Sequence, residues 1–185
     1  ATAPDAERWF QLYLVGGFDY SRRLVERAEA AGYRALVLTV DLPVLGRRER
    51  DIRSGFVLPP MPHMDAAGDE REHRYGGLED QRIAGLTWDS LGEVRSWSSL
   101  PLVLKGILSP ADAALAAEAG AAAIVVSNHG GRQLDRTISS PAALGAVGDA
   151  VAGRCEIWVD GGIRRGIDVL TAIALGASGV LVGRP

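Results

Sequence analysis

The sequence has little cysteine and no long apolar run. A single Cys among 185 residues cannot form an internal disulfide, so nothing indicates an oxidising compartment. No apolar run approaches the roughly 18 to 20 residues that a membrane-spanning helix needs. The first residues also lack the basic and then apolar layout of a signal peptide. We therefore expect a cytoplasmic protein that does not bind membranes.

Net charge is also low, and this excludes two more classes of protein. The formal net charge is -3 and 47% of the residues are apolar, a composition too apolar for a disordered chain. The sequence lacks a basic stripe, which argues against nucleic acid as the main partner. His63 and His73 lack metal-ligand spacing, so we expect no metal. Glycine, in contrast, is abundant, with 23 residues that mostly stand where an apolar run ends or a helical segment begins.

Short apolar runs alternate with segments of helical period along the chain. The apolar runs cover residues 9–14, 35–40, 102–105, 123–127, 156–160 and 180–183. The helical segments cover 21–31, 88–97, 111–119, 141–151 and 166–175, and we expect Ser109 and Ser140 to cap two of them. Nearly continuous apolar runs are typical of strands covered on both faces. The pattern therefore predicts a parallel α/β sheet.

Such a sheet can be open and doubly wound, or it can be part of a barrel. A closed eight-stranded barrel usually needs about 200 residues or more. Residues 55–85 show no sustained period, and we expect them to form a mobile loop. The chain also begins without Met and stops directly after an apolar run. We therefore expect one domain, residues 1–185, that is incomplete at its N-terminus.

Polar residues follow the predicted strands rather than precede them. In parallel α/β folds, ligands bind at the carboxyl ends of the strands. The repetition of this placement from strand to strand therefore predicts a binding site at that edge. The polar residues at the strand ends are Thr39, Asp41, Lys105, Ser127, His129, Asp160 and Arg184.

Two neighbouring strand ends have the composition of a phosphate site. The first holds Asp160, Gly161, Gly162, Ile163 and Arg164 between a strand and a helix, and the second holds Gly183 and Arg184. Adjacent glycines let backbone N–H groups approach an anion, and a helix N-terminus adds partial positive charge. The alternative is a tight turn with two surface arginines. The two arginines at consecutive strand ends favour phosphate.

The segment 127–132 is the second candidate for chemistry. Imidazole can accept a proton near neutral pH, which suits His129 to act as a base. Arg132 can bind a carboxylate through two parallel hydrogen bonds. Asp41, on another strand end, can stabilise an imidazolium. A lone histidine is more often structural, but the presence of Arg132 and Asp41 favours a catalytic role for His129.

Three further predictions rest on position alone. Lys105 ends a very apolar strand, which leaves open a nucleophile, an electrostatic stabiliser or an ion-pair partner. The arginine-rich run 46–53 indicates a solvated face, although one arginine can turn into the site because the run follows Asp41. Gln11 and Tyr13 share one face of the first strand, for which core packing is the alternative.

Taken together, the motifs resemble those of one enzyme family. From residue 9 to residue 185, the chain is similar to FMN-dependent 2-hydroxy-acid oxidases and dehydrogenases. The motifs that carry this similarity are WFQLY, LTVDLP followed by GRRERDIR, PLVLKGI, SNHGGRQLD, DGGIRRG and GVLVGRP. That family includes glycolate oxidase, lactate oxidase and monooxygenase, flavocytochrome b2 and mandelate dehydrogenase. The resemblance implies a (β/α)8 TIM barrel of which this chain supplies about strands three to eight, with FMN as the cofactor.

The resemblance also implies roles for the candidate residues. His129 matches the active-site base, Asp41 the carboxylate paired with it, and Tyr13 a hydrogen-bond donor to the substrate. Arg132 and Arg48 match ligands of the substrate carboxylate, and Lys105 matches the cation beside the flavin ring. Gln11, Thr39 and Ser127 match contacts to the ring. Matches to ribityl and phosphate contacts are Asp160, Gly161, Gly162, Ile163, Arg164, Gly183 and Arg184.

The implied reaction is oxidation of a small (S)-2-hydroxy acid to the 2-oxo acid, with electrons passed to oxygen or another acceptor. The implied full-length protein is a homo-oligomer. One alternative is another FMN-binding barrel enzyme, such as a type 2 isopentenyl diphosphate isomerase, against which the segment 127–132 argues. The other is an inactive truncated remnant. The sequence departs from the family pattern after Asp135, where Arg136, Thr137 and Ile138 replace a Gly and small residues.

Overall fold

The computed structural model describes residues 6–14, 17–44, 46–56 and 86–183. Strands and helices alternate as the sequence predicts, and the predicted bounds differ from the observed ones by up to three residues. The expected mobile loop, with His63 and His73, lies outside the described residues except for Gly55 and Phe56. In chain order the elements are β1 (Trp9–Leu12), α1 (Phe18–Ala30), β2 (Ala35–Thr39), α2 (Glu49–Ser54), α4 (Trp88–Ser96), β3 (Leu102–Ile107), α5 (Pro110–Glu118), β4 (Ala123–Val126), the 3-10 helix η1 (His129–Gly131), α6 (Ser140–Val151), β5 (Glu156–Val159), α7 (Gly166–Ala174) and β6 (Gly179–Val180).

The strands form one parallel sheet whose spatial order is the chain order. All pairs are parallel, and the order is β1-β2-β3-β4-β5-β6. A doubly wound sheet reverses its strand order at a switch point, and this sheet does not. The sheet is also curled, because Trp9 of β1 and Trp158 of β5 meet edge to face with ring centroids 4.9 Å apart. The fold is therefore part of a (β/α)8 barrel, as predicted.

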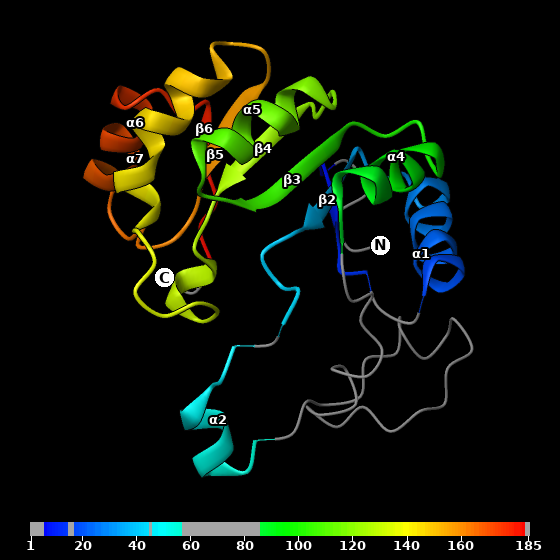
Figure 1. The fold of residues 1–185 in the computed structure, drawn as a ribbon, viewed down its shortest axis with the longest axis horizontal. Helices are drawn as coiled ribbons and strands as arrows, with labels where there is room; N and C mark the ends of the chain where they lie inside the picture. Colours follow the sequence, from blue (N-terminus) through cyan, green and yellow to red (C-terminus); the bar gives the residue numbers. More distant parts are fainter. Residues whose placement is uncertain (1–5, 15–16, 45, 57–85, 184–185) are drawn as a thin grey trace.

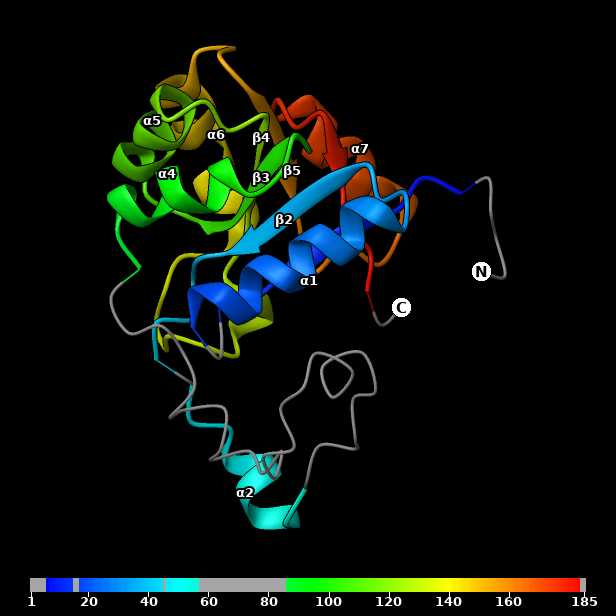
Figure 2. The same cartoon turned by 90° about the vertical axis from the view of Figure 1, so that its right-hand side faces the viewer.

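Alternate residues of each strand pack into two separate apolar layers. On β2, Leu36 and Leu38 belong to the cluster shared with the helices, whereas Ala35 and Val37 belong to the cluster on the barrel interior. The helices cover one face of the curled sheet (Figures 1 and 2). Because both faces are covered, both sets of side chains are apolar, which explains the nearly continuous apolar runs.

One of the two expected helix caps is confirmed and the other is corrected. The Ser109 side chain accepts a hydrogen bond from the backbone N–H of Asp112 and caps α5. The N-cap of α6 is Ser139 rather than Ser140. The Ser140 hydroxyl is buried and accepts from the backbone N–H of Asn128 at 3.2 Å, so it is committed to the loop after β4. Within the described part of the chain, no helix has the length and apolar character to cross a membrane.

The arginine-rich run 46–53 contains α2, which the sequence did not predict. This helix lies apart from the sheet and its helices (Figures 1 and 2), and none of its residues is buried. Its Arg53–Glu49 ion pair, at 2.6 Å, joins two exposed side chains. The expectation of a solvated face is therefore right. The sequence does not predict this helix because six residues are too few to show a helical period.

Candidate active site

The carboxyl ends of the strands open into a cavity of about 1110 Å³. Three predicted residues do not line this cavity but form hydrogen bonds to residues that do, namely Asp41, Thr39 and Ser127. Arg48 does not line it, and Arg184 lies outside the described residues. The predicted site residues that line it are Gln11, Tyr13, Lys105, His129, Arg132, Asp160, Gly161, Gly162, Ile163, Arg164 and Gly183.

His129 and Asp41 form a hydrogen-bonded pair at the cavity. Nδ1 of His129 lies 3.0 Å and 3.2 Å from the two carboxylate oxygens of Asp41. Both side chains are largely buried, with 13% and 14% of their surface exposed. A carboxylate accepts hydrogen bonds but does not donate them, so Nδ1 carries the hydrogen. In the neutral form of the imidazole, Nε2 then carries the lone pair that can accept a proton from a ligand.

The loop after β4 holds His129 in an uncommon backbone conformation. His129 has a φ of 57°, in the left-handed region, and such residues gather at functional sites. Its backbone N–H donates to Ser127 Oγ at 3.0 Å. The Asn128 side chain accepts from the Gly131 N–H at 3.1 Å, and the Asn128 N–H donates to Ser140 Oγ. The sequence placed Asn128 in the candidate segment 127–132 without a role of its own and indicated Ser140 only as a helix cap, although Asn is a residue that commonly forms turns.

The sequence departure after Asp135 also has a backbone consequence. Arg136 adopts a φ of 62°, a conformation that glycine adopts more readily than residues with a side chain. The Arg136 side chain is exposed, so the residue adopts this conformation without burying its charge. The loop therefore keeps a left-handed turn at the position where the resemblance leads us to expect a small residue.

Lys105 and Asp160 form a largely buried ion pair inside the barrel mouth. Lys105 Nζ lies 2.9 Å from Asp160 Oδ2 and donates to Ser127 Oγ at 3.0 Å. The two side chains are 12% and 18% exposed. The second oxygen of Asp160, Oδ1, is buried and has no hydrogen-bond partner among the described residues. A nucleophilic lysine must be a neutral amine, which an adjacent carboxylate disfavours, so the geometry supports an ion-pair or electrostatic role.

Gln11 and Tyr13 both line the cavity, and Tyr13 also packs against the apolar core. Nε2 of Gln11 donates to Tyr13 Oη at 2.9 Å and to Thr39 Oγ1 at 2.8 Å. Because the Tyr13 hydroxyl accepts in this contact, its own hydrogen is free to be donated to a ligand.

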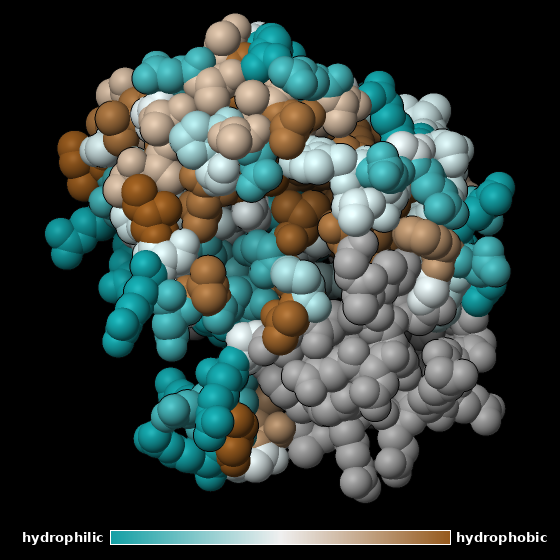
Figure 3. All heavy atoms as spheres, viewed as in Figure 1, coloured by the Kyte–Doolittle hydropathy of each residue, from teal (hydrophilic) through white to brown (hydrophobic). Residues whose placement is uncertain are grey.

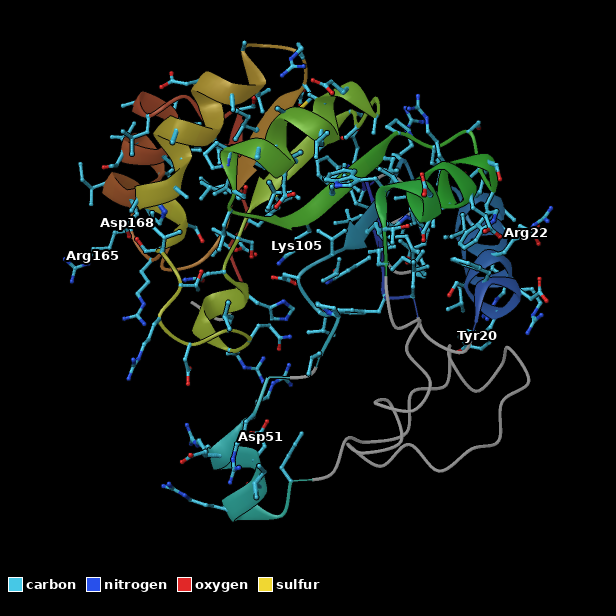
Figure 4. All side chains as sticks on the ribbon, in the orientation of Figure 1. Tyr20, Arg22, Asp51, Lys105, Arg165 and Asp168 are labelled. Carbon is cyan, nitrogen blue, oxygen red and sulfur yellow. The ribbon has the colours of Figure 1, made fainter. Side chains whose placement is uncertain are left out.

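Of the two candidate arginines, Arg132 lines the cavity and Arg48 does not. The guanidinium of Arg132 lies 3.9 Å from a carboxylate oxygen of Asp51. Asp51 belongs to α2 and is labelled in Figure 4. Arg48 is the N-cap of the same helix and is half-buried. Nε2 of Gln133 donates to the carbonyl of Val44 at 3.2 Å, which ties the segment after β2 to the loop after β4.

Gly162, in the loop after β5, leaves open space beside the cavity. Gly161 and Gly162 have φ values of 88° and 79°, and a Cβ on Gly162 would meet nothing within 4 Å. The N-terminus of α7, however, is already occupied. The Asp168 carboxylate accepts from the backbone N–H groups of Arg164 and Arg165 at 2.9 Å and 2.8 Å (Figure 4). The expected contribution of this helix terminus to phosphate binding is therefore reduced, while the Arg164 side chain still lines the cavity.

The hydrogen bonds from these two N–H groups make the stability of the N-terminal end of α7 depend on pH. They hold the pKa of Asp168 below its ordinary value, so the carboxylate stabilises the fold above pH 4 or so and loses that contribution as the pH falls through its lowered pKa. Asp168→Asn should lower the stability of the full-length protein to urea at pH 7, and the difference from the native protein should shrink toward pH 3. A difference that is independent of pH would contradict this role.

Comparisons with known proteins agree with this geometry. The profile of the family described as FMN-dependent dehydrogenase matches residues 1–185. An L-lactate oxidase from Nostoc sp. is 55% identical over 188 residues, which cover 96% of this chain and 52% of that protein. A 4-hydroxymandelate oxidase from Amycolatopsis orientalis is 51% identical over 185 residues, with 96% and 52% covered.

Solved structures show the same fold. The crystal structure of a mandelate oxidase superimposes with a TM-score of 0.81 at 50% sequence identity, and the match covers 95% of this chain and 50% of that one. A mandelate oxidase variant with (S)-mandelic acid gives a TM-score of 0.82, also at 50% identity. The chain therefore spans about half the length of the relatives it matches.

Proposed function

Since the chain belongs to the family of FMN-dependent dehydrogenases, we propose that the full-length protein oxidises a small (S)-2-hydroxy acid to the 2-oxo acid with FMN. The observation that carries this proposal is the His129–Asp41 pair, with its Nδ1 hydrogen bonded and its Nε2 available, beside a cavity that also holds Arg132 and Lys105. The names of the relatives, an L-lactate oxidase and a 4-hydroxymandelate oxidase, support this substrate class.

The residues around the cavity fit FMN. Asp160 Oδ1 is a buried acceptor without a partner among the described residues, as a ribityl hydroxyl requires. The open space over Gly162 and the Arg164 side chain suit a phosphate, with Gly161, Ile163, Gly183 and Arg184 completing this end. Gln11, Thr39 and Ser127 would contact the ring, and Lys105 would place a cation where negative charge develops. Bound FMN supplies the acceptor for two electrons.

The remaining residues bind the substrate and handle its proton. Arg132 and Arg48 bind the carboxylate, and the Tyr13 hydroxyl donates a hydrogen bond to the substrate. His129 Nε2 accepts one of the two protons that the substrate loses when its CH–OH group becomes a carbonyl. Asp41 then stabilises the imidazolium through Nδ1–H. The second hydrogen leaves the substrate with the electron pair or after it.

The direct test is anaerobic reduction of the full-length, FMN-loaded protein. Lactate, glycolate and mandelate are added separately, and the flavin absorption band near roughly 450 nm is followed. At least one of the three acids should bleach the band, and isopentenyl diphosphate should leave the spectrum unchanged. Failure of all three, together with turnover of the diphosphate, would replace the proposed function by the rival FMN enzyme. A full-length protein that binds no flavin would indicate a remnant.

We also propose a cytoplasmic homo-oligomer as the working form. The single cysteine is consistent with a reducing compartment. Apolar side chains show at the surface where α6 and α7 lie (Figure 3), and Ile167 and Leu170 of α7 are 63% and 66% exposed. Such surface suits contact with the rest of the full-length chain or with a second copy. Light scattering of the full-length protein distinguishes an oligomer from a monomer.

A further inference from the structure

We infer that Gly106 is a positioning residue, which lets Asp41 reach His129 because position 106 has no side chain. The inference rests on the proposed function, in which this pair handles the substrate proton. Gly106 is not among the residues that line the cavity, and it acts only through Asp41. Two observations carry the inference, namely the backbone conformation of Gly106 and the position that a Cβ would take there.

Gly106 is the extra residue of a bulge in β3. The register of β3 against β4 pairs Lys105 with Val125 and Ile107 with Val126, so Gly106 has no partner of its own. Its φ is 110°, a conformation that residues with a side chain rarely adopt. The bulge lies at the point where Lys105 turns toward Asp160. It is therefore part of how the strand end presents its side chains to the site.

The bulge brings the backbone of β3 directly against Asp41. A Cβ at position 106 would lie 2.6 Å from both Cβ and Cγ of Asp41, and 3.0 Å from its backbone nitrogen. Carbon atoms in contact normally lie about 3.5 to 4.0 Å apart. Any side chain at this position therefore forces Asp41 to move.

The backbone around Asp41 has little freedom to move away. The N–H of Val40, the residue before it, donates to the Lys105 carbonyl at 2.8 Å, on the same bulge. The Asp41 carbonyl accepts from Nε2 of Gln133 at 3.4 Å. The Asp41 side chain must therefore turn instead, and this separates its carboxylate from Nδ1 of His129. A shift of about 1 Å in a catalytic group can cost about 10²-fold in rate.

Gly106→Ala tests this inference, with Gly176→Ala as the matched control. Gly176 follows α7 with a φ of 100°, so an Ala there bears similar backbone strain, but its Cβ would meet nothing within 4 Å. Both variants are made in the full-length, FMN-loaded protein. The first readout is the NMR signal of the His129 Nδ1–H, assigned with His129→Gln and protected from exchange by the bond to Asp41. The second is kcat/KM for the hydroxy acid that bleaches the flavin.

Gly106→Ala should lose the Nδ1–H signal and about 10²-fold in kcat/KM, whereas Gly176→Ala should keep both. In an Asp41→Gly background, where Cβ and Cγ are absent, adding Gly106→Ala should change kcat/KM less than twofold. Retention of the signal in Gly106→Ala, or an equal loss of rate in both backgrounds, would overturn the inference. A protein that bleaches with none of the acids defeats the proposed function, while the NMR signal still tests the positioning.

Folding provides an independent check if Gly106→Ala is unstable. Its loss of thermal stability beyond that of Gly176→Ala should largely disappear in the Asp41→Gly background, because Cβ and Cγ of Asp41, the two atoms that its Cβ would approach most closely, are gone and only the backbone nitrogen at 3.0 Å remains. If Gly106→Ala still lost more thermal stability than Gly176→Ala in the Asp41→Gly background, Gly106 would be needed only for the backbone conformation of the bulge. The positioning role would then be wrong.

Discussion

Replacing His129 by Gln in the full-length, FMN-loaded protein should slow flavin reduction by the accepted hydroxy acid about 10³-fold. The Gln side chain can still donate a hydrogen bond to Asp41, but it offers no basic nitrogen to take the substrate proton. The native imidazole is held with Nδ1 3.0 Å from Asp41, so its Nε2 is the only basic atom that the replacement removes. Stopped-flow recording of anaerobic flavin bleaching measures the rate.

The matched control for His129→Gln is Arg22→Gln on the exposed face of α1. Among the described residues, Arg22 forms an ion pair with Glu26 alone, and its side chain is 58% exposed, so this variant should reduce its flavin at the native rate. The flavin spectrum of each variant before substrate addition checks that the cofactor is bound. Unchanged bleaching in His129→Gln would remove this residue from the mechanism.

Replacing Lys105 by Met should destabilise the protein by about 3 kcal/mol. The change leaves Asp160 without its cation in a site where the carboxylate is 18% exposed and one of its oxygens has no described partner. A buried charge without a partner costs more than the ion pair itself contributes. Adding Asp160→Asn removes that charge, so the double variant should recover part of the loss. Urea unfolding of the full-length protein measures each variant.

Arg53→Met is the control for Lys105→Met. It breaks the exposed Arg53–Glu49 pair on α2, where solvent screens both charges, and should cost less than about 1 kcal/mol. If Lys105→Met cost no more than Arg53→Met, or if Asp160→Asn worsened it, the pair in the barrel mouth would not be a buried charge that depends on its partner.

Most of the fold could be predicted from local patterns in the sequence. The two-residue period of a strand places Leu36 and Leu38 on one face of β2 and Ala35 and Val37 on the other, so two covered faces require a continuous apolar run. Polar residues at the strand ends predicted the edge at which the cavity lies. The short helix α2 was missed, because its six residues make no buried contact that would impose a periodic pattern.

Local period did not separate a barrel from a doubly wound sheet, because it carries no information on strand order. The motif resemblance predicted the barrel, and the tertiary structure confirmed it through the strand order. Only the tertiary structure decided the contacts between strand ends. His129 lies 88 residues from Asp41 in the chain, and Lys105 meets Asp160 across β4. Such pairings depend on the register and curl of the sheet, which many packed side chains set together. The close approach of Gly106 to Asp41 has the same origin, since a bulge in one strand and the end of its neighbour meet only after the sheet has formed.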